Sequence, residues 1–275
     1  MDNVAGKCVL ITGAAMGMGR LYAEHAVREG AAAVVLWDIN AAELDKTAAE
    51  LRGRGGKVHA QVVDVSQQPA IAAAAETLRR EVGEPDVLIN NAGIVRGKYF
   101  WEHDPQKDIY ATMAINALAP MYITREFLPG MIARRDRQAR IVNISSAASM
   151  VSNPRMSVYC GSKWACTGWS DSVRLELEAA GHAHIKLLTV CPTYIATGMF
   201  EGVKKMLFTP ILTPQSVVDA VWQGMKAGRV RLILPWTVYL SNALKGLLPV
   251  RLFDWMARHV FRVYNTMDEF KGRSS

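Results

Sequence analysis

The sequence predicts a doubly wound α/β domain, in which a parallel sheet of about seven strands carries helices on both faces. Short apolar runs rich in β-branched residues recur along the chain, and segments with helical spacing separate them. Strands that are apolar throughout are typical of parallel sheets covered on both faces. Right-handed crossover connections place the intervening helices on those two faces.

Seven segments are expected to form the strands. They are KCVLIT (7–12), AVVLWD (33–38), KVHAQVVDV (57–65), DVLIN (86–90), RIVNISS (140–146), HIKLLTV (184–190) and VRLIL (230–234). Between them, the segment 41–56 ends on glycines and the segment 68–83 carries Pro69 near its start, and both features favour helices.

Length and composition indicate one domain. The 275 residues are 50% hydrophobic, which is enough for one sizeable core. We expect residues 1–235 to form the domain that contains the functional site. Residues 236–275, where the composition shifts toward Trp, Leu and Arg, are expected to be a helical extension of it.

The charge pattern does not favour nucleic-acid binding. The net charge is +7, but the 32 Lys and Arg residues are scattered among 25 acidic residues without a long basic run. We therefore expect no nucleic-acid partner.

The cysteines and the start of the chain favour a cytoplasmic location. Cys8, Cys160, Cys166 and Cys191 form no CxxC pair, so neither a metal site nor a disulfide framework is expected. The first residues, MDNVAGK, lack the basic start and long apolar stretch of a signal peptide.

The stretch TGAAMGMG (12–19) lies where the first strand turns into the first helix. Glycines and free amides at a helix start let a phosphate approach the backbone closely. Gly13 is expected to make the tight turn, Gly17 to admit a pyrophosphate, and Gly19 to let the helix pack on the strand.

Asp38 ends the second predicted strand, where a carboxylate can accept both ribose hydroxyls of an adenosine. The same carboxylate repels a 2′-phosphate, and neither Ile39 nor Asn40 offers a cation to offset that repulsion. The sequence therefore predicts NAD rather than NADP as the cofactor.

A set of motifs gives the chain a specific resemblance. TGAAMGMG, Asp64-Val65, NNAG (90–93), Asn116, Ser146 and YCGSK (159–163) occur in the order and approximate spacing of the short-chain dehydrogenase/reductase family. The resemblance covers roughly residues 5–235, and the glycine spacing is similar to that of its short single-domain branch. It implies a Rossmann fold and hydride transfer.

The YxxxK pair also has a physical logic of its own. Positions 159 and 163 are neighbours on one face of a helix, and an ammonium beside a phenol favours the phenolate. A free tyrosine has a pKa of about 10, so a general base near neutral pH needs a downward shift. Lys163 and a positive nicotinamide are expected to supply it together.

The resemblance implies a role for each matching residue. Tyr159 is the general acid/base, and Ser146 rather than Ser145 holds the substrate oxygen. Lys163 also binds the nicotinamide ribose, and Asn116 holds a water in a proton relay, unless it is a buried amide satisfied by the backbone. Asn90 stabilises the central sheet. The implied cofactor contacts are Gly13, Ala15, Met16, Gly17, Met18, Gly19, Asp38, Ile39, Asp64, Val65, Asn91, Ala92, Gly93, Tyr159, Lys163, Pro192, Thr193, Ile195 and Thr197.

One position departs from the family pattern. After the sixth predicted strand the family usually has Pro-Gly, whereas here Pro192 is followed by Thr193. A residue with a side chain at this position is expected to change the flexibility of the loop beside the nicotinamide.

Three segments are expected to select the substrate: the loop after NNAG, residues 147–156, and the lid, residues 194–208. Their apolar residues suit a lipophilic alcohol. Those residues are Phe100, Trp101, Met150, Tyr194, Met199, Phe200, Met206 and Phe208. The alternative is an acidic or acyl-CoA substrate bound by the cations Arg96, Lys98, Lys204 and Lys205.

The tail predicts an amphipathic helix from residue 252 onward. Leu252, Met256, Val260 and Tyr264 follow an i, i+4 row, while Arg251, Arg258 and Arg262 gather around Trp255. The apolar row covers the chain's own pocket or a neighbouring subunit, or else lies on a membrane as a peripheral contact. A homodimer or homotetramer is expected.

Taken together, these features predict an NAD-dependent oxidoreductase that interconverts a lipophilic secondary or primary alcohol and its ketone or aldehyde. A rival from another class is a nucleotide-sensing protein that keeps the fold without turnover. Tyr159 and Lys163, whose loss would favour the rival, are both present.

Overall fold

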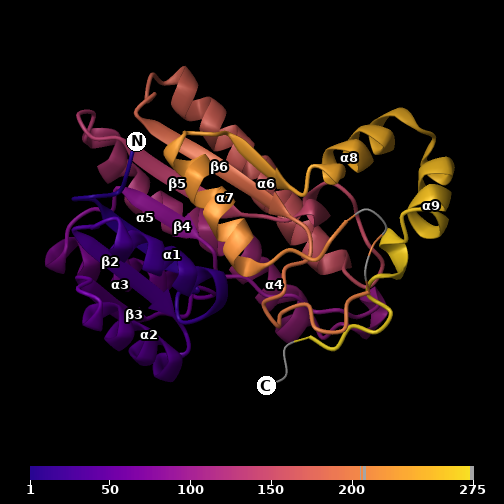
Figure 1. Ribbon diagram of the computed structural model, residues 1–275, viewed down its shortest axis with the longest axis horizontal. Helices are drawn as coiled ribbons and strands as arrows, with labels where there is room; N and C mark the ends of the chain where they lie inside the picture. Colours follow the sequence, from indigo (N-terminus) through magenta and orange to yellow (C-terminus); the bar gives the residue numbers. More distant parts are fainter. Residues whose placement is uncertain (205, 207–208, 273–275) are drawn as a thin grey trace.

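Seven parallel strands form the centre of the computed structural model, which describes residues 1–204, 206 and 209–272 (Figure 1). Their order is β3-β2-β1-β4-β5-β6-β7, so the predicted doubly wound fold is confirmed. The strands are β1 (Cys8–Thr12), β2 (Ala33–Asp38), β3 (Val58–Val62), β4 (Val87–Asn90), β5 (Ala139–Ile144), β6 (Ile185–Pro192) and β7 (Arg231–Leu234).

Helices cover both faces of the sheet. They are α1 (Gly17–Arg28), α2 (Ala41–Gly53), α3 (Gln68–Glu81), α4 (Ala111–Met113), α5 (Ala119–Ala133), α6 (Ser157–Ala179), α7 (Pro214–Lys226), α8 (Thr237–Leu247) and α9 (Val250–His259). One apolar cluster joins α1, α2 and α7 to the sheet, and a second joins α3, α5 and α6 to it.

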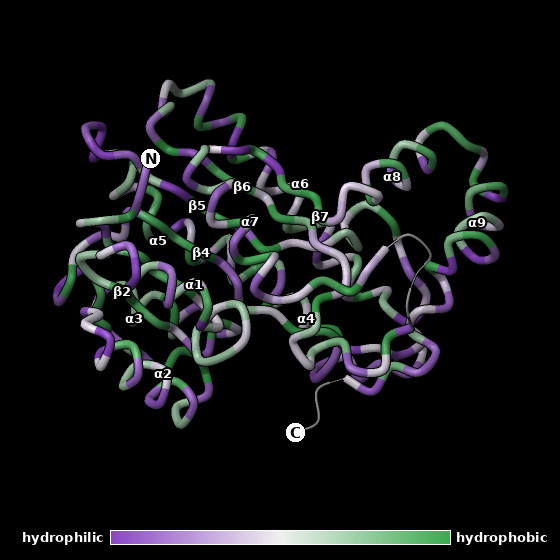
Figure 2. Tube along the Cα trace, in the orientation of Figure 1, coloured by the Kyte–Doolittle hydropathy of each residue, from purple (hydrophilic) through white to green (hydrophobic). Residues whose placement is uncertain are grey.

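The strands are buried on both sides because their alternate residues enter different clusters. In β1, Val9 and Ile11 pack with α1, whereas Cys8 and Leu10 pack with the opposite helix layer. Figure 2 shows the hydrophobic residues concentrated along the strands in the middle of the body. This two-sided burial explains why the strands are apolar throughout.

Two strands end earlier than the sequence predicts. The third ends at Val62 because it is an edge strand that pairs only with β2, whose last residue, Asp38, lies opposite Val62. The fifth ends at Ile144, so Ser145 and Ser146 lie beyond it. Both early ends place predicted site residues in loops at the carboxyl edge of the sheet.

The strand order creates a crevice between β1 and β4. The chain leaves β1 toward the β2 side and leaves β4 toward the β5 side, so the loops that follow these two strands separate. Ligands of doubly wound sheets bind at such a switch point, beyond the carboxyl ends of the strands.

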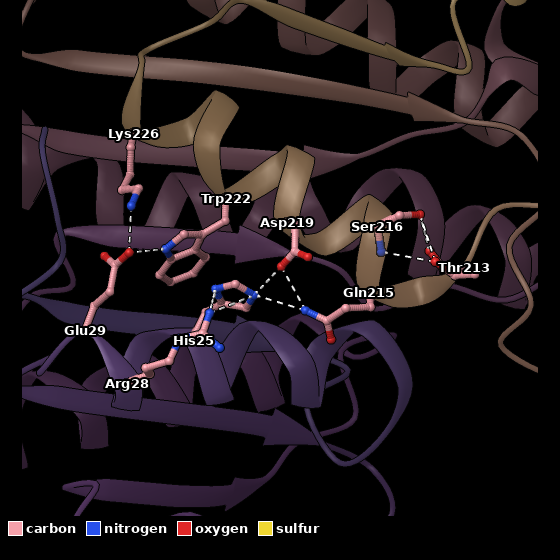
Figure 3. A network of polar contacts seen from close by, with 9 residues as sticks. All are labelled: His25, Arg28, Glu29, Thr213, Gln215, Ser216, Asp219, Trp222 and Lys226. Atoms are coloured by element: carbon pink, nitrogen blue, oxygen red, sulfur yellow. Dashed lines mark hydrogen bonds and ion pairs between the residues drawn. The ribbon is translucent and has the colours of Figure 1, made fainter.

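A polar network ties α1 to α7 (Figure 3). His25 Nε2 lies 2.8 Å from Asp219 Oδ1, and Glu29 accepts hydrogen bonds from Trp222 Nε1 (2.9 Å) and Lys226 Nζ (2.6 Å). α7 follows the lid, and α1 starts at the glycine turn. The network therefore holds the helix after the lid against the helix after the glycine turn.

The C-terminal part differs from the single predicted helix. Two helices, α8 and α9, stand away from the body in Figure 1. The second buries Phe253 and Ala257 rather than the predicted row that begins at Leu252, and Tyr264 lies in the short 3-10 turn Val263–Asn265. The helix ends at His259, and Arg262, with left-handed backbone (φ 56°), lies between it and that turn.

Among the described residues, no helix is long and apolar enough to cross a bilayer.

Gly19 generates a stability prediction. An ideal Cβ at this residue would lie 2.0 Å from the Gly13 carbonyl oxygen, so Gly19→Ala must push α1 off the turn after β1. We expect a loss of about 3 kcal/mol in the free energy of unfolding, measured by urea denaturation.

The matched control is Gly168→Ala, because Gly168 is an exposed helical glycine whose Cβ would meet no atom within 4 Å. It should be neutral or stabilising by up to about 1 kcal/mol. Equal stabilities of the two variants would contradict the close packing at Gly19.

Candidate active site

A cavity of about 360 Å³ lies at the carboxyl edge of the sheet, over the switch point. It is long enough to connect the loop after β2 with the start of α6. Its lining residues are Gly13, Met16, Gly17, Met18, Trp37, Asp38, Ile39, Asn40, Val63, Asp64, Val65, Asn91, Ala92, Gly93, Ile94, Ile115, Ile144, Ser145, Ser146, Tyr159, Lys163, Pro192, Thr193, Ile195, Thr197, Met199 and Phe200.

The glycine turn forms one wall of this cavity. Gly13 (φ 63°) and Gly17 (φ 58°) both adopt left-handed backbone, which only glycine adopts without strain. Of the predicted cofactor contacts, Ala15 and Gly19 do not line the cavity. The Ala15 amide donates to Asp38 Oδ2 (2.9 Å), and Gly19 packs against Gly13, so both support the turn from behind.

Two carboxylates, Asp38 and Asp64, mark one end of the cavity. Asp38 accepts hydrogen bonds from the amides of Ala15 and Asn40, which orient its side chain. Lys163, at the other end, is the one cation among the described lining residues. These groups fit a dinucleotide. The amides at the start of α1 can bind its phosphates, and the two carboxylates can accept hydrogen bonds from a ribose.

Tyr159 and Lys163 lie one turn apart on α6 at the other end of the cavity. The Lys163 ammonium nitrogen lies 5.7 Å from the centre of the Tyr159 ring and donates to the Ile144 carbonyl (2.8 Å). Each residue is only 5% exposed, so neither side chain is an ordinary solvated surface group.

Burial shifts the pKa of both side chains toward their neutral forms. It raises the pKa of the Tyr159 phenol, while a hydrogen bond with Ser146 lowers it in part. Burial lowers the pKa of the Lys163 ammonium, against smaller opposing effects of Cys166 and Cys191. The protein alone thus holds a protonated phenol, and the phenolate needs further positive charge nearby.

The structure separates the roles of the two serines after β5. Ser145 donates to the Lys163 carbonyl oxygen (3.1 Å) and contacts Thr167 Oγ1 (2.7 Å), so its hydroxyl is committed to α6. Ser146 accepts from the Ala148 amide (3.1 Å) and lies in the wall beside Tyr159. Both serines line the cavity, and the choice of Ser146 over Ser145 as the residue that holds the substrate oxygen stays a prediction.

Asn116 lies in a π-helical stretch, residues 114–118, behind the cavity wall. Its amide nitrogen donates to the Ile94 carbonyl (2.8 Å) and to Ser162 (3.1 Å), and its oxygen accepts from the Ile94 amide (2.9 Å). The side chain is therefore satisfied by protein partners and fixes the loop after β4. Its role in a proton relay stays a prediction.

The two asparagines of NNAG have different positions. Asn90 donates to Asn143 (2.8 Å) and joins β4 to β5 inside the sheet, as expected. Asn91 donates to the carbonyls of Thr12 (3.0 Å) and Gly13 (3.2 Å), and so links the loop after β4 to the glycine turn.

A second, smaller cavity of about 70 Å³ adjoins the first, and both share Ser146, Thr193 and Phe200. Its walls are mainly apolar and reach the base of α8. Its lining residues are Ser146, Ala147, Ala148, Val151, Asn153, Met156, Thr193, Tyr194, Phe200, Met206, Thr209, Val238, Ser241 and Val263.

The predicted substrate residues divide into three groups. Tyr194, Phe200 and Met206 line the second cavity, and Met199 lines the first. Phe208 lies outside the described residues. The prediction is wrong for the remaining three: Phe100 and Trp101 are exposed on the surface, and Met150 is buried in a separate cluster.

The cations of the alternative substrate prediction are paired with acids. Arg96 and Lys98 contact the buried Asp108, at 3.5 and 2.7 Å, and Lys204 contacts Glu269 at 2.9 Å. Lys205 lies outside the described residues. The pairing leaves little reason to assign an acidic substrate to this site.

Sequence reasoning missed the residues that the C-terminal extension brings to the site. Val238, Ser241 and Val263 line the second cavity, and Met267 lies in the buried cluster that contains Tyr159. No local pattern marks these residues. Val238 and Ser241 come from α8, which follows β7, and Val263 and Met267 come from the chain that returns after α9.

Comparison with known proteins agrees with this geometry. The family model described as short chain dehydrogenase matches residues 7–207. The chain belongs to the short-chain dehydrogenase family. The match covers the glycine turn, Ser146, Tyr159 and Lys163, so family membership rests on the part of the chain that builds the larger cavity.

Similar short-chain dehydrogenases include proteins with curated names. The chain is 36% identical over 259 residues to estradiol 17-beta-dehydrogenase 11 of Pongo abelii, covering 94% of this chain and 84% of that protein. It is 37% identical over 271 residues to epidermal retinol dehydrogenase 2 of Homo sapiens, covering 98% of this chain and 86% of that protein.

Solved structures of the family have the same fold. A short-chain dehydrogenase/reductase from Burkholderia phymatum in complex with NAD superposes with a TM-score of 0.81, at 25% identity over 90% of this chain and 95% of that one. A short-chain dehydrogenase from Sphingobium yanoikuyae in complex with NADPH has a TM-score of 0.75, at 28% identity over 88% and 94%. A nicotinamide cofactor is therefore typical of these neighbours.

Proposed function

We propose that the protein is an NAD-dependent oxidoreductase that interconverts a lipophilic alcohol and its carbonyl partner. One observation carries the proposal: Ser146, Tyr159 and Lys163 meet at one end of a cavity whose other end is the glycine turn and Asp38. A chain that only sensed nucleotides would not need a buried tyrosine and lysine beside a serine hydroxyl at the far end of the nucleotide cavity.

The residues of this chain divide the proton chemistry among them. Ser146 hydrogen-bonds the substrate oxygen, and Tyr159 takes the hydroxyl proton during oxidation or returns it during reduction. The Lys163 nitrogen lies 5.7 Å from the centre of the Tyr159 ring, so when this amine is protonated its charge favours the phenolate and opposes the effect of burial. When bound, the nicotinamide accepts or supplies the hydride.

The preference for NAD rests on charge at the adenosine end. Asp38 and Asp64 lie there, and among the described lining residues the single cation, Lys163, is at the opposite end. A 2′-phosphate would meet the Asp38 carboxylate without a compensating cation. Solved structures of the family are in complex with NAD or with NADPH, so this charge argument is what supports NAD for this chain.

The proposal of a lipophilic substrate is supported by the second cavity and by the names of the relatives. Its walls beside Ser146 are mostly apolar, and related proteins are named as estradiol and retinol dehydrogenases. Ligand pockets usually measure about 300–1,000 Å³. Since this cavity measures about 70 Å³, a large substrate requires the lid to move outward.

Loss of the phenol tests the reaction class. Tyr159→Phe should lower turnover of NAD with a panel of lipophilic alcohols by about 10²–10⁴-fold, because the proton has no acceptor. NADH formation is followed at 340 nm, and NAD affinity, measured by calorimetry, should stay within about twofold, because only one hydroxyl is removed.

Tyr22→Phe is the matched control for that variant. Tyr22 is a fully buried tyrosine of α1, and its hydroxyl has no hydrogen-bond partner among the described residues. It should keep full turnover. Turnover by Tyr159→Phe equal to that of the unchanged chain would refute the assigned role, and intact NAD binding without any turnover in the unchanged chain would favour the nucleotide-sensing rival.

The cofactor preference is tested by reversing the charge at the adenosine end. Asp38→Ser combined with Ile39→Arg should move the ratio of kcat/KM values for NADP and NAD by about tenfold or more toward NADP, since a new cation meets the 2′-phosphate. Asp38→Asn is the control that removes the charge while keeping the side-chain shape. An unchanged ratio in the double variant would show that Asp38 does not select the cofactor.

The outer surface of α8 and α9, here called the hairpin face, supports a proposal of peripheral membrane contact. Its exposed apolar residues are Trp236, Tyr239, Leu240, Leu247, Val250, Leu252, Trp255 and Val260. Arg251, Arg258 and Arg262 are exposed around it. Apolar residues with tryptophan and arginine suit an anionic lipid surface, whereas two such basic faces repel one another.

Vesicle sedimentation tests the hairpin face. The chain should associate with vesicles containing anionic lipid more strongly than with neutral ones, and Leu247→Ser with Trp255→Ser should weaken association by about tenfold or more. Trp101→Ser, at an exposed tryptophan elsewhere, is the control. If the chain ignores vesicles and light scattering shows an oligomer that the hairpin variant dissociates, a second copy covers the face instead.

A further inference from the structure

The C-terminal segment 263–272, here called the strap, crosses the active-site end of the molecule. In Figure 1 it is the yellow segment that returns from α9 toward the body. It is bonded to the lid through its main chain, because the Lys204 amide donates to the Thr266 carbonyl and the Lys271 amide donates to the Glu201 carbonyl, both at 3.0 Å. The strap and the lid therefore close the site together.

Two glycines show how closely the strap fits. An ideal Cβ on Gly202 of the lid would lie 2.2 Å from the Glu269 carbonyl oxygen. One on Gly97, in the loop after β4, would lie 2.2 Å from the Phe270 ring and 2.9 Å from Met267 Cε. The lid and this loop thus leave no room for even one methyl group against the strap.

Thr266 fixes the strap from a third side. Its hydroxyl donates to the Val263 carbonyl (2.8 Å), so it must accept from Asn153 Nδ2 (2.7 Å), and it lies 2.8 Å from the Tyr194 hydroxyl. The residue is fully buried. These contacts tie the strap to the loop before α6 and to the start of the lid.

Met267 is the strap residue that shares a buried apolar cluster with Tyr159. It is 1% exposed and belongs to one buried cluster with Val95, Met156, Tyr159 and Cys160. It lines neither cavity, so on this side of Tyr159 the space is filled by side chains. The open space beside Ser146 is instead the second cavity, which extends to α8.

We propose that Met267 limits the smaller substituent on the reacting carbon of the substrate, a role that rests on the proposed function. The longer apolar arm occupies the second cavity, which leads away between Phe200 and Val238. Primary alcohols and methyl carbinols with one long lipophilic arm are then the preferred substrates. Carbinols whose second substituent is larger than methyl should react more slowly.

A series of alcohols with one common apolar arm tests this assignment. The reacting carbon carries hydrogen, methyl or propyl as its second substituent, and kcat/KM with NAD is measured for each. Met267→Ala should raise the ratio of propyl to methyl carbinol by about tenfold or more, because the added methylenes enter the space that the thioether fills. Met267→Val should shift it less, in the same direction.

Met267→Leu is the matched control, since it conserves volume and should leave the ratio within about threefold. Thermal melting confirms that each variant is folded. If Met267→Ala lowers kcat/KM equally for all members of the series, the residue only stabilises the closed site, and the proposal is wrong.

A second readout does not depend on turnover. Cys160 is 4% exposed and shares the Met267 cluster, so iodoacetamide should modify it faster in Met267→Ala than in Met267→Leu, measured by mass spectrometry at one pH. Equal rates would overturn the role of Met267 as a wall. If the unchanged chain oxidises no alcohol, the proposed function fails, and the Cys160 rates alone decide whether Met267 closes this space.

Discussion

The burial of the Lys163 ammonium is the constraint on which the candidate active site depends. Charged groups inside a protein are costly unless they are bonded, and this one donates to the carbonyl at the end of β5. That bond sets the position of α6 against the sheet and thereby of Tyr159, one turn earlier. The serine that follows β5 lies in the same wall because the strand ends at Ile144.

The same constraint leaves the site electrostatically incomplete for the proposed proton transfer. Burial favours a neutral phenol at Tyr159 and weakens the ammonium form of Lys163, so the protein alone does not hold a phenolate. In the proposed function, a nicotinamide bound in the larger cavity supplies the additional positive charge. The site thus places Ser146 and Tyr159 side by side, but it lacks the positive charge that a phenolate at Tyr159 would need.

The closure of the site comes from segments far apart in the chain. The lid follows β6, while the strap is the end of the C-terminal extension, and main-chain hydrogen bonds join the two. The C-terminal extension therefore forms part of the wall around the candidate active site. Its two helices carry an exposed apolar face, and the segment after them contributes Met267 to the surroundings of Tyr159.

Much of the site was predictable because its signals are local. The glycines of the first turn, Asp38 at a strand end and the YxxxK spacing each depend on backbone geometry over a few residues, and the structure brings them to one cavity. The early end of β3 was not predictable, because it depends on the length of its only neighbour, β2. Phe100 and Trp101 were misassigned because apolar character alone does not decide whether a loop residue faces inward.

The sequence by itself determined the alternation of strands and helices, the glycine turn and the residue types of the candidate active site, since periodicity and residue chemistry encode them directly. Only the tertiary structure decided which residues close the substrate side. Gly97 and Phe270 are distant in the chain and meet because the chain reverses at Arg262 and packs back against the lid. Such contacts depend on the shape of the whole folded domain, and no short pattern encodes them.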